Sequence, residues 1–308
     1  MIAIDLFAGA GGFTEAATAA GLRVAWAADH DPRAVAAHEA NHPEVEHACQ
    51  DLRQADFSAL PRYDVLLASP ACQGHSSAGR AARKRGGRAA AKHDADRSTA
   101  WAVVDCAEAT SPRAIIVENV VDLRRWPLFP VWRTALETLG YHVTEHILDA
   151  AHFGVPQNRT RLFVTATKRR RSVAMNPRPL AMVPSSTVLD ERTEGWAPVT
   201  TKSGDIQARV AKGRARCGSR FLTQHVTGHG GRRLDEPMAT ITTVSGHWHL
   251  VDGVMMRPLT VRELARGQSF RDTFALPTEI TLGTRLVGNA VPPLLARAVI
   301  EATMEVAA

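Results

Sequence analysis

The sequence predicts an α/β protein: a doubly wound, mostly parallel sheet with a smaller, irregular second domain. Two observations predict this fold. In residues 1–168, apolar strand-like runs alternate with helix-like segments, as in sheets covered by helices on both faces. In residues 169–256 the alternation stops, and the chain becomes rich in Pro, Gly, Ser, Thr and Arg, with only short strand-like runs such as residues 238–244.

The strands and helices of the first part follow one another in a regular order. The expected strands are residues 2–7, 22–29, 63–69, 113–119, 141–148 and 161–167. The expected helices are residues 13–21, 31–42, 98–110 and 129–140, and helical character returns over residues 260–268 and 294–307. Gly21 and Gly140 are helix stop signals, and Pro32 fits a first helical turn.

The distribution of charge indicates a polyanionic partner. The net charge is +6, but basic residues gather in two zones: seven basic and two acidic residues in 80–97, and fourteen basic and seven acidic residues in 168–256. Two basic zones on an otherwise acidic chain favour binding to a polyanion. A pair of solvated loops explains the charge pattern alone equally well.

The sequence argues against a transmembrane protein and a disulfide-stabilised one. It has no run of 18 apolar residues, and its first residues lack the basic lead and cleavage site of a signal peptide. The four cysteines, at positions 49, 72, 106 and 217, form no C-x-x-C pair, so we expect neither disulfides nor a metal site. A reducing, cytoplasmic environment fits this pattern.

The segment "DLFAGAGG", residues 5–12, favours a nucleoside ligand. Its glycines let a ligand approach the backbone, and the helix that follows offers free N–H groups. Asp29, at the end of the second strand, can accept hydrogen bonds from ribose hydroxyls. The dinucleotide-binding fingerprint fits poorly, because Thr14 stands where its third glycine would be. A turn with a purely structural purpose stays open.

Other reactive residue types also follow strand ends, and each has a plainer explanation. Cys72 lies in a polar loop with nearby arginines, which favours the reactive thiolate, but an isolated cysteine is more often inert. Glu118 is a cap for the next segment, a general acid, or a carboxylate that reads a base edge. Arg159 and Arg161 would share one face of a strand, or be surface arginines. "GNAVPP", residues 288–293, also suits a helix start.

The order of these segments resembles the cytosine-5 DNA methyltransferase family. Six segments match that family's motifs in order: "DLFAGAGG", "SPACQGHS", "VENV", "QNRTR", "RPLTVRELARGQSF" and "GNAVPP". The resemblance covers nearly the whole chain and is weakest in the variable part. It implies a Rossmann-like catalytic and cofactor-binding domain in residues 1–168, a target-recognition domain in 169–256, and a return to the catalytic domain in 257–308.

The resemblance implies S-adenosylmethionine as the cofactor and S-adenosylhomocysteine as its product. Phe7 would lie against the adenine, Asp29 would bind the ribose, and Asp51 would lie near the adenine amino group. Asn289 would close the pocket. The cofactor-binding residues implied by the resemblance are Phe7, Ala8, Gly9, Gly11, Gly12, Asp29, His30, Asp51, Leu52, Ser69, Asn289 and Ala290.

The resemblance also implies the reaction. The target cytosine would be flipped out of the duplex. Cys72 would attack carbon 6, while Glu118 would hold or protonate the ring nitrogen beside the amino group. Arg161 would hydrogen-bond the ring carbonyl oxygen, with Arg159 supporting it or contacting a phosphate. Carbon 5 would then take the methyl group, and loss of its proton and of Cys72 would restore the ring.

Double-stranded DNA is the partner that the resemblance implies. Residues 73–97 would form a loop that closes on DNA, and residues 169–256 would insert loops into the major groove. The residues expected to contact DNA are Gln73, Ser76, Ser77, Arg80, Arg83, Arg97, Thr240 and Ile241. The family resemblance further implies a monomer in a bacterial or phage-infected cell, without an obligatory protein partner, and it allows a cognate restriction endonuclease.

The match departs from the family at one position. Ala71 stands directly before Cys72, where the family usually has proline, so this loop costs more entropy to order. Two alternatives stay open. One is an RNA (tRNA) methyltransferase, although the tRNA-acting relatives carry a Cys-Phe-Thr element that is absent here. The other is an inactive DNA-binding paralogue, against which the presence of Cys72, Glu118, Arg159, Arg161 and Asn289 argues.

Overall fold

A computed structural model describes residues 1–71, 98–169, 171–175, 181–225 and 230–307. The chain forms two compact units, and we describe each by itself. The first unit comprises Met1–Asp149, Thr160–Pro177 and Pro293–Ala308, and the second comprises Ala150–Arg159 and Arg178–Pro292. The second unit therefore takes in most of the segment that the sequence analysis assigns to the return of the catalytic domain. The predicted domains are defined by function, and their boundaries stay a prediction.

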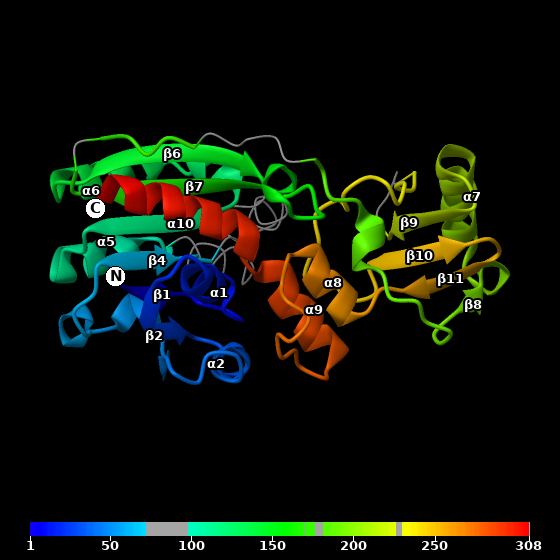
Figure 1. The fold of residues 1–308 in the computed structure, drawn as a ribbon, viewed down its shortest axis with the longest axis horizontal. Helices are drawn as coiled ribbons and strands as arrows, with labels where there is room; N and C mark the ends of the chain where they lie inside the picture. Colours follow the sequence, from blue (N-terminus) through cyan, green and yellow to red (C-terminus); the bar gives the residue numbers. More distant parts are fainter. Residues whose placement is uncertain (72–97, 170, 176–180, 226–229, 308) are drawn as a thin grey trace. The chain divides into compact units, whose positions relative to one another are not determined.

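The first unit is built on a seven-stranded sheet with the strand order β3-β2-β1-β4-β5-β7-β6 (Figure 1). The strands are β1 (Ile2–Leu6), β2 (Arg23–Asp29), β3 (Glu46–Cys49), β4 (Val65–Ala68), β5 (Ala114–Asn119), β6 (His142–Asp149) and β7 (Thr160–Thr167). All neighbours from β3 to β5 pair in parallel, whereas β7 runs antiparallel to both β5 and β6. This mostly parallel sheet confirms the predicted fold class.

Among the described residues, five α-helices belong to this unit, and all were expected from the sequence. They are α1 (Gly12–Ala19), α2 (Pro32–Glu39), α5 (Trp101–Thr110), α6 (Phe129–Thr138) and α10 (Pro293–Ala307). The expected boundary signals act as predicted. Pro32 lies in the first turn of α2, where Asp31 is the N-cap residue. Gly21 and Gly140 follow the ends of α1 and α6 with φ angles of +80° and +88°. α5 packs against α6, and α1 packs against α10.

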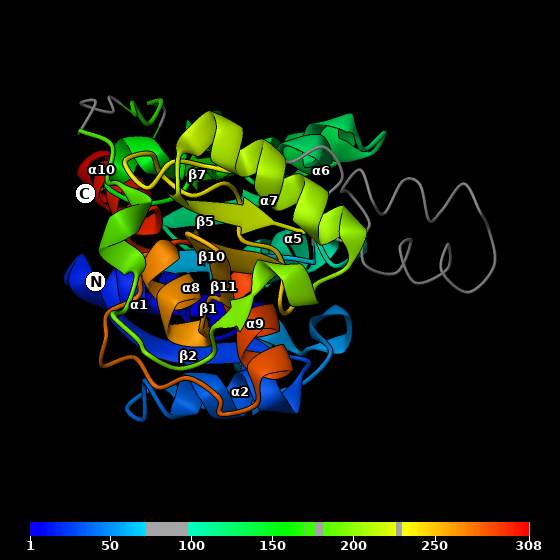
Figure 2. The ribbon, with the colours of Figure 1, turned by 90° about the vertical axis from the view of Figure 1, so that its right-hand side faces the viewer.

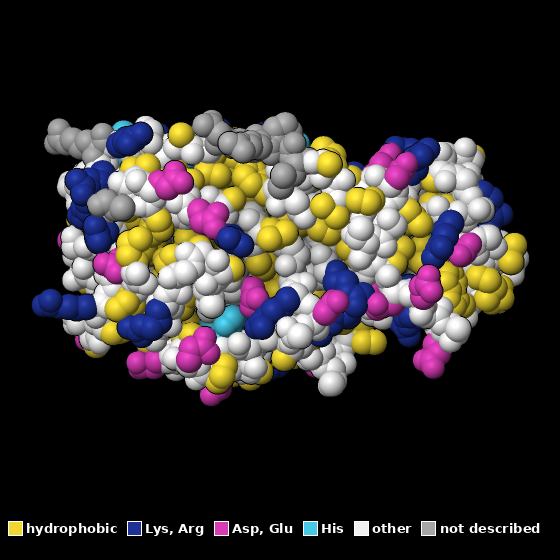
Figure 3. Space-filling model, viewed as in Figure 1, with side chains coloured by type: hydrophobic (Ala, Val, Ile, Leu, Met, Phe, Trp, Pro, Cys, Tyr) yellow, Lys and Arg dark blue, Asp and Glu magenta, His cyan; other side chains and the backbone are white. Residues whose placement is uncertain are grey.

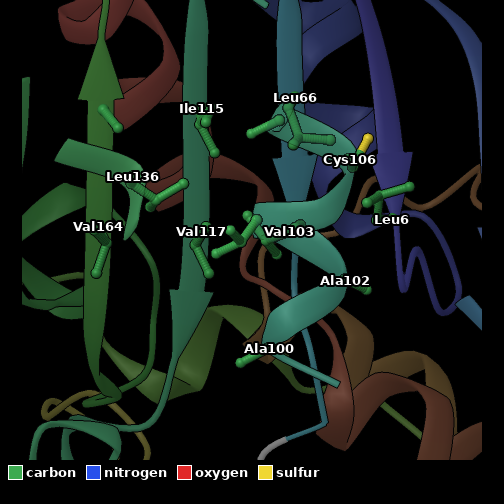
Figure 4. Close-up of a cluster of buried hydrophobic side chains, with 14 of the residues drawn as sticks. Leu6, Leu66, Ala100, Ala102, Val103, Cys106, Ile115, Val117, Leu136 and Val164 are labelled. Carbon is green, nitrogen blue, oxygen red and sulfur yellow. The ribbon is translucent and has the colours of Figure 1, made fainter. Parts of the chain in front are cut away.

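The central strands β4 and β5 are buried on both faces because helices cover them. Every residue of β4 and β5 is buried, without the alternation of a one-sided sheet. In Figure 4 the side chains of Val103 and Cys106 on α5 lie beside Leu66 of β4 and Val117 of β5. This core fixes the positions of the strand ends, where the candidate site lies.

Among the described residues, the second unit contains a four-stranded antiparallel sheet of order β8-β11-β10-β9 (Figure 1) and three α-helices, α7, α8 and α9 (Figure 2). The strands are β8 (Ala197–Pro198), β9 (Arg220–Gln224), β10 (Trp248–Asp252) and β11 (Met255–Pro258). The helices are α7 (Gly204–Cys217), α8 (Val261–Gly267) and α9 (Ile280–Asn289). A buried ion pair between Arg257 and Glu263, 2.6 Å apart, joins β11 to α8.

Three features of this unit differ from the sequence expectation. The helix α7 was missed because only Val210 and Gly213 of its residues are buried, so it has almost no apolar pattern. The helix α9 was missed, and Asn289 is its last residue rather than part of a turn. The prediction of a strand over residues 238–244 is wrong. Met238 forms a single bridge, and the segment pairs with no strand beyond it. The side chains of Gln157 and Arg159 hold its backbone at Ile241 instead.

Two further observations concern the surface and membranes. On the face shown in Figure 3, lysine and arginine side chains of the described residues lie among aspartate and glutamate side chains. In the part of the chain that the structure describes, no helix has the length and apolar character needed to cross a membrane.

Candidate active site

The candidate site lies at the carboxyl ends of four parallel strands. β1 ends at Leu6, β2 at Asp29, β4 at Ala68 and β5 at Asn119. Because these strands run in the same direction, their ends share one edge of the sheet. Most of the residues that the sequence singled out in the first unit follow these ends.

The loop after β1 is held in a backbone shape that few residues adopt. Phe7, Gly9 and Gly11 have φ angles of +60°, +56° and +101°, in the left-handed region. The Ser69 hydroxyl donates a hydrogen bond to the Phe7 carbonyl at 2.9 Å, and this contact supports the strained Phe7. A Cβ atom at Gly9 would meet nothing within 4 Å, so the loop is open to a ligand there.

Asp29 connects this loop to β2. One of its carboxylate oxygens accepts from the Gly9 N–H at 3.0 Å, and the other accepts from the Asp31 N–H at 2.9 Å. The same carboxylate lies 3.2 Å from Nδ1 of His30, and this hydrogen bond raises the pKa of His30. Each carboxylate oxygen can accept about two hydrogen bonds, so Asp29 keeps capacity for ribose hydroxyls.

Asp51 and Leu52 lie beyond β3. The Asp51 carboxylate accepts from the Arg53 backbone N–H at 3.1 Å and pairs with the Arg53 guanidinium at 2.5 Å. The hydrogen bond from Arg53 lowers the pKa of Asp51 to about 2, so Asp51 is ionised at neutral pH. Leu52 is buried in the core of the first unit and anchors this segment.

Glu118 and Arg161 form an ion pair across β5 and β7. Glu118 lies opposite Phe163, and Arg161 is two residues before Phe163, so both side chains extend from the same face. Nε of Arg161 lies 3.0 Å from Oε1 of Glu118, and the side chains are 14% and 8% exposed. Nη1 of Arg161 donates to the Thr160 carbonyl at 2.8 Å. The pair thus places a carboxylate and a guanidinium at the site edge.

Asn119 fixes the segment that leads to the predicted nucleophile. Its side-chain amide donates to the Pro70 carbonyl at 2.9 Å, and its side-chain oxygen accepts from the Val120 N–H at 2.9 Å. Asn119 is 1% exposed, so this bond is shielded from water. The structure therefore ties the end of β5 to the loop two residues before position 72.

Several predicted residues lie outside the described part of the chain. These are Cys72, Gln73, Ser76, Ser77, Arg80, Arg83 and Arg97. Asn289 and Ala290 lie in the second unit, where Asn289 is exposed and Ala290 is buried. Ala8 is buried, and Gly12 begins α1.

Arg159 lies in a different environment from Arg161. It precedes β7 and belongs to the second unit, so the prediction that the two arginines share one strand face is wrong. Its guanidinium donates to the carbonyls of Ile241 at 3.2 Å, Gly288 at 3.0 Å and Ala290 at 3.1 Å. These contacts hold the backbone of residues 241, 288 and 290.

The sequence analysis missed the role of Gln157. Its side chain is fully buried, accepts from the Ile241 N–H at 2.7 Å, and donates to the Gly267 carbonyl at 3.1 Å. Ile241, expected to contact DNA, is 1% exposed and packs in an apolar cluster, whereas Thr240 is only half-buried. Gln157 is the first residue of the segment "QNRTR", in which the sequence analysis singled out only the two arginines.

The comparisons with known proteins decide the family. The profile described as C-5 cytosine-specific DNA methylase matches residues 1–305. The chain belongs to this family. This confirms the resemblance on which the sequence analysis relied.

Individual relatives of the chain agree with the assignment. The chain is 30% identical to the Type II methyltransferase M1.HphI of Haemophilus parahaemolyticus, over 98% of this chain and 86% of the relative. It is 28% identical to the Type II methyltransferase M.HpaII of Haemophilus parainfluenzae, over 94% of this chain and 85% of the relative. The solved structure of the Entamoeba histolytica methyltransferase EhMeth has a TM-score of 0.73 at 15% identity, covering 99% and 98% of the two chains, and supports the fold.

Proposed function

We propose that the protein is a DNA (cytosine-5)-methyltransferase that methylates carbon 5 of a flipped cytosine through a covalent adduct with Cys72. The observation that carries the proposal is the Glu118–Arg161 pair at the carboxyl edge of the sheet, beside the Asn119–Pro70 contact that leads toward Cys72. A buried carboxylate and guanidinium side by side match the ring nitrogen, amino group and carbonyl oxygen of cytosine.

The residues of the first unit fit S-adenosylmethionine as the cofactor. When bound, it supplies the methyl group to carbon 5. The open backbone at Gly9 gives it room, and the first turn of α1 has no side-chain cap to occupy its N–H groups. Asp29 has hydrogen-bonding capacity for the ribose hydroxyls. The ionised carboxylate of Asp51 can accept a hydrogen bond from the adenine amino group.

The chemistry at the base follows from the donors and acceptors of these side chains. The thiolate of Cys72 forms a bond to carbon 6, and the electron pair displaced to the ring nitrogen takes a proton from the carboxyl group of Glu118, which acts as general acid. Nη2 of Arg161 has no partner among the described residues, so it can donate to the ring carbonyl oxygen. After carbon 5 is methylated, it loses its proton to a base, the bond to Cys72 breaks, and the ring becomes aromatic again.

The proposed DNA-binding residues lie in both predicted regions. Residues 73–97 would close on the flipped base, and Thr240 would contact DNA from residues 169–256. The bonds of Gln157 and Arg159 to Ile241 support a fixed backbone beside Thr240, and Ile241 itself has a packing role. The proposed setting is a monomer in the cytoplasm of a bacterial or phage-infected cell. Because the relatives are Type II methyltransferases, a restriction endonuclease is a proposed companion.

Transfer of labelled methyl groups from S-adenosylmethionine to duplex DNA of mixed sequence tests the proposal. The wild type should label cytosine in DNA, and Cys72→Ala should abolish labelling. Cys217→Ala is the matched control, because Cys217 is a free cysteine at the end of α7 in the second unit, and it should leave transfer unchanged. Transfer to tRNA but not to DNA would establish an RNA methyltransferase instead. DNA binding without transfer to any nucleic acid would establish an inactive paralogue.

A further inference from the structure

Four side chains form a continuous line of hydrogen bonds from β1 to β3. Oδ2 of Asp5, on β1, lies 2.9 Å from the hydroxyl of Thr14 on α1. That hydroxyl lies 3.0 Å from Nε2 of His38 on α2. Nδ1 of His38 lies 2.8 Å from Nε2 of His47 on β3. None of these four residues has a part in the reaction proposed above.

The inner end of this line is shielded from water, and the outer end is not. Asp5 and Thr14 are fully buried and His38 is 1% exposed, whereas His47 is half-buried. Among the described residues, Oδ1 of Asp5 has no hydrogen-bond partner. An ionised carboxylate in such a place is costly, because burial removes its hydration. The line of hydrogen bonds joins this buried carboxyl group to the half-buried His47.

Every link can carry a proton in either direction, because both His38 nitrogens and the Thr14 hydroxyl donate or accept. With Asp5 protonated, Asp5 donates to Thr14, Thr14 donates to Nε2 of His38, and Nδ1 of His38 donates to His47. With Asp5 ionised, all three bonds reverse. In passing from the first state to the second, one proton moves along each link, and Nδ1 of His47 releases one proton to solvent. His38 is neutral in both states.

The line touches the proposed cofactor loop at two places. A Cβ atom at Gly11 would lie 3.1 Å from the ring carbons of His38 and His42, so both imidazoles pack directly against the loop. Asp29, which holds the Gly9 N–H, is also close enough to Asp5 to repel its negative charge. A change of charge on Asp5 is therefore felt where the loop is held.

We propose that Asp5, Thr14, His38 and His47 form a proton relay that couples the charge beside the cofactor loop to pH. This inference rests on the proposed function for the identity of the ligand. S-adenosylmethionine carries a positive sulfonium and S-adenosylhomocysteine does not. Ionisation of Asp5 therefore favours the substrate form of the cofactor over the product form, and Thr14 and His38 are positioning residues that act through Asp5.

The charged groups around the relay agree with a switch near neutral pH. Burial raises the pKa of Asp5 to about 7. The hydrogen bond from Thr14 lowers this pKa, and the repulsion from Asp29 raises it. Burial lowers the pKa of His38 to about 3, with repulsion from His42 and His47 adding to the effect. The other charged groups that face these residues are Glu15 and Glu44 beside His42, and His30, Asp31 and Asp51 around Asp29.

The first experiment measures the affinities of the full chain for S-adenosylmethionine and S-adenosylhomocysteine between pH 6 and pH 8. In the wild type, the preference for S-adenosylmethionine should rise several-fold over this range, and in Asp5→Asn it should stay constant. Thr14→Val removes the hydroxyl that stabilises ionised Asp5, so its midpoint should move to higher pH. Thr14→Ser keeps the hydroxyl and should keep the wild-type midpoint. A flat wild-type profile, or equal midpoints in Thr14→Val and Thr14→Ser, would overturn the proposal.

A second experiment separates the relay from the proposed function. The carboxyl carbon of Asp5 is followed by nuclear magnetic resonance during a pH titration of the protein without ligand. A midpoint near 7 that rises in Thr14→Val and in His38→Phe, but not in Thr14→Ser, supports the relay whether or not methyl transfer occurs. A midpoint near the ordinary aspartate value overturns it. Failure to bind either cofactor form, with the titration as expected, would contradict the proposed function instead.

Discussion

The Glu118–Arg161 pair of the first unit and the Gln157–Arg159 network of the second unit show two uses of buried polar side chains. Nε of Arg161 pairs with Glu118, and Nη1 of Arg161 donates to the Thr160 carbonyl. Arg159 and Gln157 direct their donors at backbone groups of residues 241, 267, 288 and 290. The first arrangement keeps hydrogen-bonding capacity for a ligand, and the second holds loops in place. Two arginines of one short motif thus have separable roles.

Removing the charge of Glu118 should have the largest effect on activity. Glu118→Gln should lower the rate of methyl transfer by about 10²–10⁴-fold, because the ring nitrogen loses its acidic partner. The free energy of unfolding should change by less than about 2 kcal/mol, since glutamine can still accept from Arg161. Single-turnover transfer and chemical denaturation measure the two quantities. Glu137→Gln, which alters an exposed pair with Arg133, is the control and should change neither.

Breaking the second network should instead lower stability. Arg159→Met leaves buried carbonyls at Ile241, Gly288 and Ala290 without their donor, so the free energy of unfolding should fall by about 3–5 kcal/mol. Denaturant unfolding measures this loss. Arg214→Met is the matched control, because Arg214 is exposed and also donates to a backbone carbonyl, that of Gly253; it should cost under about 1 kcal/mol. Equal losses in the two variants would remove the distinction drawn between the arginines.

The packing beside Arg159 gives a sharper test of the same network. A Cβ atom at Gly288 would lie 2.4 Å from the Thr242 carbonyl oxygen, so Gly288→Ala should push the two segments apart and cost about 1–3 kcal/mol. Gly204→Ala at the start of α7 meets nothing within 4 Å and should be neutral or slightly stabilising. Thermal unfolding of the two variants compares them, and a neutral Gly288→Ala would show that the network is loosely packed.

The two units should also differ in their response to acid. Burial lowers the pKa values of His225, His247 and His249 in the second unit, that of His249 to about 3. The unfolded chain binds protons at these histidines between their folded and ordinary pKa values. Stability of this unit therefore falls as pH drops below about 6.5, by up to about 1.4 kcal/mol per pH unit for each proton.

In the first unit the pKa shifts oppose one another, since those of His38 and His146 are downward and those of Asp5 and His30 are upward. Because the pKa of His38 is lowered, this histidine makes the first unit less stable as pH falls, as the three histidines do in the second unit. Asp5 has a raised pKa, so its folded form binds the extra proton between about pH 4 and 7, and its contribution improves as pH falls. Hydrogen exchange between pH 7 and pH 5 should therefore show protection falling faster in the second unit, and His249→Gln should reduce that fall. A faster loss in the first unit would contradict the assignment.

The sequence predicted most of the first unit because its strands and helices carry local signals. Apolar runs, Gly21, Gly140 and Pro32 each act within a few residues, and the structure has them where expected. The helix α7 was missed because an exposed, arginine-rich helix has little apolar periodicity. Local signals are thus strong where an element is buried on both sides and weak where it is mostly exposed.

The site was predictable only in its residue types. The pairing of Glu118 with Arg161 spans 43 positions of the chain, and the relay from Asp5 to His47 includes two histidines, His38 and His47, that no motif marks. The separate roles of Arg159 and Arg161 depend on where β7 begins, which is a single-residue distinction. Such features follow from tertiary packing, and a pattern of spacing does not contain them.

The most direct test of the central claim uses duplex DNA in which cytosine is replaced by 5-fluorocytosine. Fluorine at carbon 5 is not released as the proton is, so the adduct with the enzyme should persist. We predict a covalent complex that forms only with S-adenosylmethionine, with the DNA attached at Cys72 in peptide mass spectrometry and with carbon 5 methylated. Absence of the complex in the wild type, or attachment at another residue, would contradict the account.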